Sequence, residues 1–251
     1  MAYTYPYKDY LSRLPPLPHP RKLIILKKIV TCAMNKPVIY TVGHSTHPFN
    51  YFLSLLREYH VNCLVDVRSV AASRYNPQYN KERFSNFLKD NGIIYLHFPE
   101  EFGARHSDPD LLDEKGKVDF AKVRRSWNFK NGVERLWLGI NKGYTIALMC
   151  SESDPFDCHR FSMITVALHQ VGFEVLHIMK NKTLKSTPDL EQLLLKKYAP
   201  QLPTSDMFQP NVTAEDRLKV AYRLRNMEIA FSPHQKVPDP TYDLEQLSRL
   251  P

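Results

Sequence analysis

Apolar residues recur with two different spacings between residues 38 and 179, and the two patterns alternate along the chain. Short apolar runs predict buried strands at 38–42, 61–67, 93–98, 144–149 and 174–179. Apolar positions three and four residues apart predict helices at 48–59, 80–91, 120–141 and 160–170. This alternation is typical of an α/β fold, a three-layer sandwich with a mostly parallel central sheet of about five strands.

Helix boundaries follow from residues with special backbone preferences. Pro48 suits the first turn of a helix, and Asn80 is a good N-cap. Gly92 and Gly172 are typical C-terminal stops. The long segment 120–141 is expected to form two helices broken near Gly132.

The charge of the chain divides it into three parts. Residues 1–36 hold seven Lys/Arg and one Asp, which gives +6 of the total +8, and they are rich in Tyr and Pro. Residues 37–180 are nearly neutral and contain the predicted α/β domain. Residues 181–251 show no strand pattern and form a helical or irregular appendage, with helices expected at 189–197 and 214–228. The basic N-terminal extension is either a solvated tail or an arm that binds nucleic acid.

The cysteines and the apolar runs bear on the compartment. Four cysteines without a disulfide-framework spacing predict reduced thiols in a cytoplasmic protein. The most apolar run, 23–34, is interrupted by Lys27 and Lys28 and is too short to span a membrane, so no membrane association is expected. Met34 stands just before the first strand, and we treat it as a possible translation start.

Polar motifs follow the ends of four predicted strands. Ligands bind at the carboxyl ends of strands in open parallel sheets, so we expect these motifs to converge on one cleft. The motif residues are His44 and Ser45, Asp66 and Arg68, Gly103 and Arg105, and Cys150, Glu152, Cys158, His159 and Arg160.

The motif with two cysteines suggests thiol chemistry. Cys150, in a strand-to-helix loop near an arginine, can have a lowered pKa and could act as a nucleophile. Glu152 or His159 could carry a proton, while Cys158 and Arg160 could bind the substrate. Cys150, Cys158 and His159 could instead ligate a metal, but their spacing is not that of a zinc finger or ribbon, so no metal is predicted. Both cysteines could also be inert buried thiols.

The other motifs allow a catalytic or a structural interpretation. Asp66 could orient a histidine or an arginine, and Arg68 could grip a phosphate or carboxylate; alternatively the two form an internal ion pair. His44 could exchange a proton near neutral pH. Ser45 could contact the substrate or cap the helix that begins near Pro48.

The loop 73–80 is polar and aromatic, and it follows the strand that ends at Asp66. Arg74, Tyr75 and Asn76 could stack on and hydrogen-bond a base or sugar, or they could simply form a turn before the next helix. Gly103 could allow the backbone to approach a ligand closely, with Arg105 beside it.

Taken in order, these motifs resemble those of the DUF488 family, a domain of unknown function. The resemblance covers about residues 38–179, with mild departures at Phe102 and Ala104, and it implies an α/β fold and a Cys/His/Arg cleft without a settled reaction. The motifs are Tyr-Thr-Val-Gly-His-Ser at 40–45, Leu-Val-Asp-Val-Arg at 64–68, Ser-Arg-Tyr-Asn-Pro-Gln-Tyr-Asn at 73–80, Phe-Gly-Ala-Arg at 102–105 and Leu-Met-Cys-Ser-Glu, then Cys-His-Arg, within 148–160.

Three functions are compatible with these residues. The first is an enzyme that acts on a small anionic or nucleotide-derived substrate in this cleft. The second is a thiol-dependent transferase or hydrolase, since the layout is similar to rhodanese-like sulfurtransferases and cysteine phosphatases, although the interval from Cys150 to Arg160 is longer than theirs. The third is a non-catalytic nucleic-acid-binding module. The sequence does not specify a cofactor.

Overall fold

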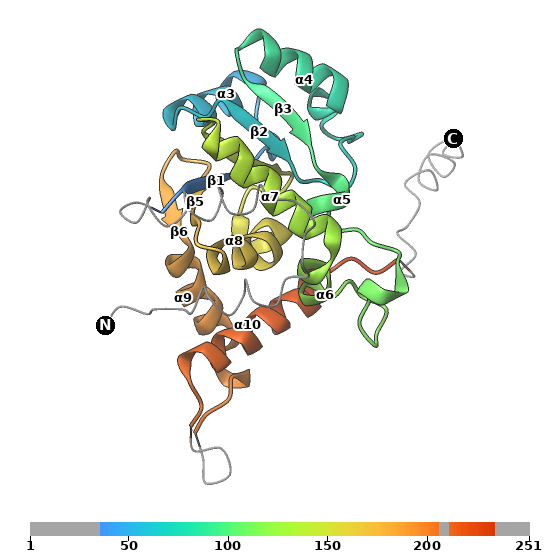
Figure 1. Cartoon of the computed structure of the whole chain (residues 1–251), viewed down its shortest axis with the longest axis vertical. Coiled ribbons are helices and arrows are strands. Elements are labelled where there is room, and N and C mark those ends of the chain that lie inside the picture. Colours follow the sequence, from blue (N-terminus) through green and yellow to red (C-terminus); the bar gives the residue numbers. More distant parts are fainter. Residues whose placement is uncertain (1–35, 206–210, 234–251) are drawn as a thin grey trace, which may run out of the picture.

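A six-stranded sheet forms the centre of the protein (Figure 1). This computed structural model describes residues 36–205 and 211–233, so the predicted N-terminal extension and the proposed start at Met34 lie almost wholly outside the described residues. The strands are arranged in the order β3-β2-β4-β1-β5-β6. Their bounds are β1 Val38–Gly43, β2 Cys63–Asp66, β3 Ile94–His97, β4 Ile146–Cys150, β5 Glu174–Ile178 and β6 Leu184–Ser186.

The first five strands are parallel, as the sequence predicts, because long crossover segments connect them. The sixth strand corrects the prediction that residues after 180 contain none. β6 pairs antiparallel to β5 after a tight turn in which Lys182 adopts a φ of 67°. It is only three residues long, which is too short for a side-chain period to appear in the sequence.

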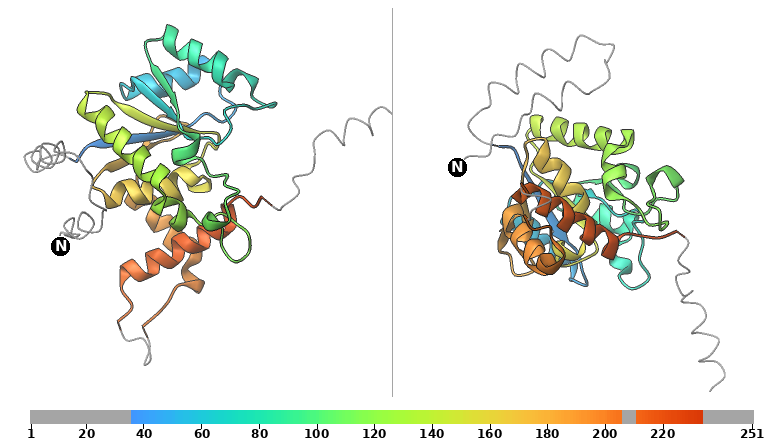
Figure 2. Two further views of the ribbon diagram at one scale, coloured as in Figure 1. Left: turned by 45° about the vertical axis from the view of Figure 1, so that its right-hand side comes forward. Right: turned by 90° about the horizontal axis from the view of Figure 1, so that it is seen from below.

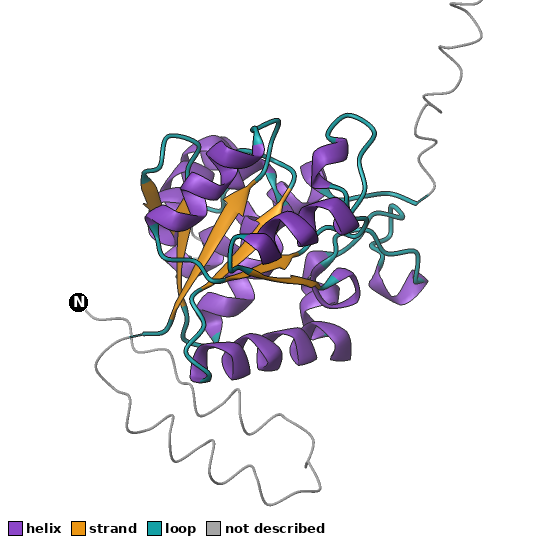
Figure 3. Ribbon diagram, turned by 90° about the horizontal axis from the view of Figure 1, so that it is seen from above, coloured by secondary structure: helices purple, strands orange, loops and turns teal. Residues whose placement is uncertain are grey.

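Helices cover both faces of the sheet, which confirms the predicted three-layer sandwich (Figure 3). The face of α3 and α4 is filled by Phe52, Leu56, Phe84 and Leu88, which pack on the sheet from one side. The bounds of the helices are α3 Phe49–Glu58, α4 Lys81–Asp90, α5 Pro99–Phe102, α6 Phe120–Arg125, α7 Trp127–Asn141, α8 Val166–Gln170, α9 Thr187–Tyr198 and α10 Ala214–Ile229.

The second face is covered by α6, α7 and α8, and here the predicted helix break is wrong. The chain breaks at Ser126, whose side chain accepts a hydrogen bond from the N–H of Phe129 at 3.2 Å and so caps α7. Gly132 lies inside α7 instead. A Cβ there would lie 2.7 Å from Glu101 Cβ and 2.9 Å from Phe102 Cζ, so glycine is needed for close packing of α5.

The predicted ends of two helices are confirmed, while the predicted cap of α4 is wrong. Gly92 and Gly172 have φ values of 74° and 97°, the left-handed conformation that ends a helix. The Asn80 side chain does not cap α4. Its Oδ1 accepts a hydrogen bond from the N–H of Ser73 at 2.7 Å, so it ties down the loop that precedes the helix.

Helices α9 and α10 pack together beside the sheet (Figures 1 and 2). A third apolar cluster joins them to the segment after Cys158, and it includes Phe161, Leu190, Leu194 and Ala221. Each helix begins with a capping box, formed by Ser186 and Asp189 in α9 and by Thr213 and Asp216 in α10. No helix within the described residues has the length and apolar character needed to cross a membrane.

Candidate functional site

The carboxyl ends of β1, β2 and β4 lie side by side, because β4 runs between the other two strands. Gly43 is in register with Cys150, and Asp66 is in register with Met149. Three of the four predicted motifs therefore meet at one edge of the sheet. They come from segments that are more than 20 residues apart in the sequence.

The loop after β4 is held from both sides. The backbone N–H groups of His44 and Ser45 donate to the carbonyls of Cys150 and Ser151, each at 2.9 Å. Gly43 is necessary here because a Cβ would lie 1.9 Å from the carbonyl oxygen of Glu152. On the other side, the guanidinium of Arg160 donates to the carbonyls of Glu152 at 2.6 Å and of the next residue at 3.0 Å.

Arg160 is fully buried and begins a π-helical turn, Arg160–Thr165, which leads into α8. The predicted helix at 160–170 is therefore present, but its first part is widened, a feature that often occurs at functional sites. Thr165 Oγ1 donates to the carbonyl of Arg160 at 2.8 Å. Two of the guanidinium nitrogens hold the loop, and the buried Arg160 Nε has no hydrogen-bond partner within the described residues.

Four side chains at the end of β4 form what we call the cysteine cluster: Cys150, Glu152, Cys158 and His159. Their sulfur, nitrogen and carboxylate oxygen atoms all lie within 4.8 Å of one another. His159 Nδ1 is 3.8 Å from the Cys150 Sγ and 3.7 Å from the Cys158 Sγ. The other ring nitrogen, Nε2, donates to the carbonyl of Val67 at 3.2 Å, which orients the ring toward the two sulfurs.

Burial differs within the cysteine cluster. Cys150, Cys158 and His159 are only 3%, 1% and 9% exposed, whereas Glu152 is exposed. The cysteines are free thiols, as the sequence predicts for those at 63, 150 and 158; the one at position 32 lies outside the described residues. The cluster thus reaches solvent through its carboxylate.

The structure reverses the expected acidity of the two cysteines. Burial disfavours a thiolate at Cys158, but the hydrogen bond from Cys150 and the positive charges of Arg160 and His159 outweigh it and lower the Cys158 pKa well below its ordinary value. The Cys150 pKa is raised well above its ordinary value, first by its hydrogen bond to Cys158 and then by burial. The direction of the Cys150 shift is therefore opposite to the one considered from the sequence.

The two remaining members of the cluster have raised pKa values. Burial alone would lower the His159 pKa, but the negative charge of Cys158 and its hydrogen bond raise it above the ordinary value. The Glu152 pKa is raised by desolvation of its carboxylate and by the nearby negative charge of Cys158.

The end of β2 carries a second buried group, which we call the Asp66 cluster: Asp66, Arg68, Tyr95 and His44. Arg68 and Asp66 form a buried ion pair with a shortest distance of 2.6 Å. Tyr95 donates its hydroxyl to the same carboxylate at 2.6 Å, and Arg68 also donates to the carbonyl of Tyr79 at 2.9 Å. This is the internal ion pair that the sequence offered as the structural alternative.

His44 does not have the proton-exchange chemistry that its sequence position suggests. Its Nδ1 donates to the carbonyl of Ser45 at 2.7 Å, and its Nε2 accepts from Arg68 at 3.3 Å, so the ring is a fixed neutral tautomer. Burial lowers the pKa of His44 to about 4, with the Arg68 charge adding to the effect. The ring stacks on Tyr79 with centroids 4.1 Å apart. With this pKa the His44 ring is neutral near pH 7.

Ser45 has a structural role in a turn. Its φ of 46° is left-handed, which is unusual for a residue with a side chain. Helix α3 has Pro48 at its N-cap position and no side-chain capping hydrogen bond, so the alternative in which Ser45 caps this helix is wrong.

The remaining predicted residues lie at the rim or pack elsewhere. Tyr75 is 88% exposed, Arg74 is exposed, and the N–H of Asn76 donates to the Ser73 hydroxyl at 3.1 Å. A Cβ on Gly103 would lie 2.3 Å from the carbonyl oxygen of Pro99, so this glycine serves close backbone packing. The guanidinium of Arg105 lies over the ring of Phe231, 5.5 Å from its centroid.

The sequence did not single out one buried polar pair. Thr41 Oγ1 is 2.8 Å from His177 Nδ1 inside the sheet, and burial lowers the pKa of His177 to about 3. The His177 Nε2 has no hydrogen-bond partner within the described residues. Both residues sit in apolar strand runs, where a single polar residue is the available sequence signal.

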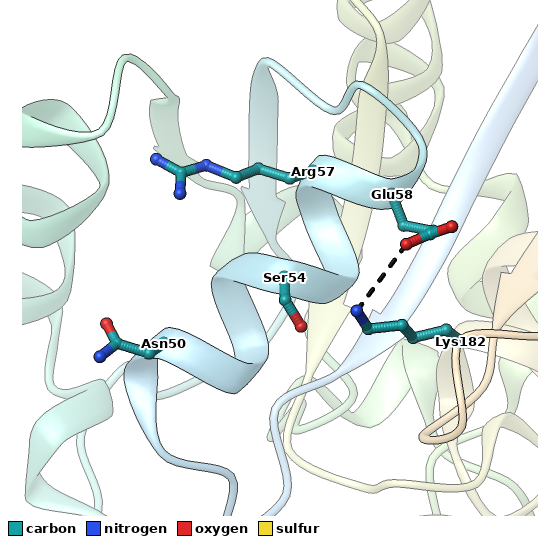
Figure 4. A pocket seen from close by; sticks show the side chains of 5 residues that line it. All are labelled: Asn50, Ser54, Arg57, Glu58 and Lys182. Carbon is teal, nitrogen blue, oxygen red and sulfur yellow. Dashed lines mark ion pairs between the residues drawn. The ribbon is translucent and has the colours of Figure 1, made fainter.

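Two surface pockets lie away from the cysteine cluster. One, of about 420 Å³, lies on the outer side of α3 and includes an ion pair of 3.8 Å between Glu58 and Lys182 (Figure 4). The other, of about 330 Å³, lies between β3 and α7 and is mostly apolar, with Ile94, Leu96 and Leu138 among its lining residues. Neither pocket includes a predicted site residue.

Comparison with known proteins gave one match. No curated protein and no solved structure matched the chain. Residues 48–166 matched the family described as "Domain of unknown function DUF488", a narrower range than the 38–179 suggested by the motifs. The matched range includes the whole cysteine cluster together with Asp66, Arg68 and Tyr95. The chain therefore carries a DUF488 domain over residues 48–166.

Proposed function

We propose that this protein is an enzyme that acts on a small anionic or nucleotide-derived substrate at the cysteine cluster. The observation that carries the proposal is the convergence of two sulfurs, an imidazole nitrogen and a carboxylate within 4.8 Å at the end of β4. Polar groups gathered in this way at the carboxyl edge of a parallel sheet are typical of active sites.

Glu152 is the side chain that a substrate would meet first, because it is the exposed member of the cluster. A carboxylate in this position can take a proton from, or return one to, a reacting group. Its backbone is held by Arg160 and by the close approach to Gly43, so the carboxylate is carried by a fixed loop. A fixed position for the proton carrier is a requirement of acid–base catalysis.

The charge of Arg160 supports an anionic substrate. No carboxylate among residues 36–205 and 211–233 lies within ion-pair distance of Arg160. The charge of Arg68, by contrast, is already balanced by Asp66. The Arg160 guanidinium is held by backbone carbonyls, and its positive charge acts on the neighbouring Cys158 and on an anion that binds beside it.

The loop after β2 supports the nucleotide-derived alternative for the substrate. Tyr75 and Arg74 are exposed on this loop, and β2, which precedes it, is the neighbour of β4 in the sheet. An exposed aromatic ring can stack on a base, while a nearby arginine can contact a phosphate.

The test is turnover of a panel of nucleotides, sugar phosphates and small phosphate esters, followed by mass spectrometry. We expect wild-type turnover of at least one compound and a loss of about 100-fold or more with Cys158→Ser or Glu152→Gln. Cys63→Ser, at the opposite end of the sheet, and Glu134→Gln, an exposed glutamate of α7, are matched controls that should keep the wild-type rate. Turnover unchanged by both cluster variants would contradict the proposal.

A further inference from the structure

The two sulfurs of the cysteine cluster are arranged around one ring nitrogen. His159 Nδ1 lies 3.7 Å from one Sγ and 3.8 Å from the other. A proton on this nitrogen can point to only one sulfur at a time, and the two distances are near the long end for an N–H···S hydrogen bond. Two equal distances instead suit three atoms that share a central ion.

The spacing agrees with tetrahedral coordination. Zinc binds thiolate sulfur at about 2.3 Å and imidazole nitrogen at about 2.0–2.1 Å, which places such ligands roughly 3.5–3.8 Å from one another. The two measured separations, 3.7 and 3.8 Å, lie in this range. The carboxylate of Glu152 lies within 4.8 Å of the other ligand atoms, so a shift of about 1 Å would bring it into the same shell.

The surroundings of the cluster are those of a metal centre. His159 Nε2 donates to the carbonyl of Val67, and this leaves the Nδ1 lone pair facing the sulfurs. Metal-bound histidines characteristically use their second nitrogen in this way. The backbone N–H of Arg160 donates to the Cys158 Sγ at 3.4 Å, which would stabilise a coordinated thiolate.

We infer that the cysteine cluster is a binding site for a thiophilic divalent metal ion, Zn²⁺ in the first place, with Cys150, Cys158 and His159 as its fixed ligands. Glu152 supplies the fourth ligand from the exposed side, where water or substrate can replace it. Two thiolates balance the charge of the divalent ion, so the buried charge of Arg160 remains for Glu152 or for an anionic substrate that replaces it. On binding, the thiols release their protons to solvent.

This inference rests on the proposed function, because it places the ion at the proposed active site. It adds a metal ion as the cofactor of the proposed enzyme. Three buried protein ligands with one exchangeable position are typical of catalytic zinc sites, whereas structural sites have four closed ligands. The sequence spacing did not predict the site, because its ligands come from a strand end and a helix start rather than from one compact loop.

The first experiment is on the full-length wild-type chain. We expect elemental analysis to give one zinc per chain, and Co²⁺ added to the metal-free protein to give thiolate-to-cobalt charge-transfer absorption. In the folded protein, bound Zn²⁺ should slow the alkylation of Cys150 and Cys158. The alkylation rate of Cys63 should be the same with and without the ion. Less than one Co²⁺ in ten chains at saturating ion, with no such absorption, would overturn the inference without any variant.

The second experiment uses variants. Cys158→Ser and His159→Ala should each weaken Co²⁺ binding by at least about 10- to 100-fold, the effect of losing even an outer-shell partner. Cys63→Ser, the matched buried cysteine, should bind as the wild type does. Equal Co²⁺ affinity in all three variants would contradict the inference.

The two proposals fail in different ways. Stoichiometric binding of zinc at these cysteines, with turnover that the cluster variants do not change, would support the metal site and contradict the proposed enzyme. Turnover that requires Cys158, in a wild-type chain that binds neither Zn²⁺ nor Co²⁺, would support the enzyme and overturn the metal site.

Discussion

The Asp66 cluster and the cysteine cluster stand on neighbouring strands, both are largely buried, and each includes or adjoins an arginine, yet their bonding differs. In the Asp66 cluster, carboxylate, guanidinium, phenol and imidazole are all paired with one another or with backbone groups. In the cysteine cluster, two sulfurs face one nitrogen and the carboxylate is exposed.

The difference separates a structural group from one that can bind a ligand. Burying a charge costs free energy unless partners satisfy it, and the Asp66 cluster meets that condition within the protein. The cysteine cluster instead brings two sulfurs, an imidazole nitrogen and an exposed carboxylate within 4.8 Å of one another. We therefore read the first cluster as the support that shapes this edge of the sheet and the second as the site of chemistry.

Removing the carboxylate of the Asp66 cluster should have the largest effect on the free energy of unfolding. Asp66→Ala would leave Arg68 buried and unpaired, so we expect the free energy of unfolding to fall by about 3–5 kcal/mol. Urea unfolding measures it, with Tyr95→Phe as a milder comparison that removes one hydrogen bond to the same carboxylate. A loss below about 1 kcal/mol for Asp66→Ala would show that the ion pair is not the support we describe.

A methyl group added at the end of β1, where the chain approaches the loop after β4, should disturb the cysteine cluster more than the Asp66 cluster. A Cβ on Gly43 would overlap the carbonyl of Glu152, so Gly43→Ala should cost about 1–3 kcal/mol and shift the loop that carries this carboxylate. Co²⁺ titration and urea unfolding together test this. Gly139→Ala is the control, since the close neighbour of its Cβ would be the movable Cδ1 of Ile146, at 2.8 Å. Unchanged Co²⁺ affinity in Gly43→Ala would argue against a tightly held loop.

His177 is intermediate between the two clusters in its hydrogen bonding. It is buried, its Nδ1 pairs with Thr41, and its Nε2 has no partner within the described residues. Burial lowers its pKa to about 3, from 6.5 in the unfolded chain, so between these values the unfolded state binds a proton that the folded state does not. Stability is then complete above pH 6.5 and falls by about 1.4 kcal/mol per pH unit below it.

Urea unfolding at several pH values tests this contribution. His177→Asn should flatten the slope between pH 6 and 4 by about 1.4 kcal/mol per pH unit, whatever the variant's stability at neutral pH. An identical slope in wild type and variant would mean that His177 ionises in the folded protein as it does in the unfolded chain.

The smallest effect on stability is expected at the rim. Tyr75 is 88% exposed, so Tyr75→Ala should change the free energy of unfolding by less than about 0.5 kcal/mol. If its ring stacks on a nucleotide-derived substrate, KM should rise in this variant while kcat stays near the wild-type value. A change in kcat without a change in KM would contradict that role.

Much of the fold was predictable because burial leaves a pattern in the sequence. The five parallel strands are mostly apolar runs, and Gly92 and Gly172 mark helix ends through their positive φ. The strand β6 and the break at Ser126 were not predictable. Strand β6 is too short for a repeating side-chain pattern to appear in the sequence. Gly132 is a more obvious candidate for the helix break than Ser126, but the structure shows that Gly132 is required for close packing against α5.

The sequence by itself determined that an α/β sheet would bring polar motifs to the ends of its strands, since strand ends in parallel sheets share one edge. Only the tertiary structure decided what each motif does there. Whether Arg68 meets Asp66 or a ligand, and which of Cys150 and Cys158 has the more acidic thiol, depends on neighbours distant in the chain. Partners such as Tyr95 and the carbonyl of Val67 reach these side chains through folding alone, and their hydrogen bonds set the charge and the orientation of each group.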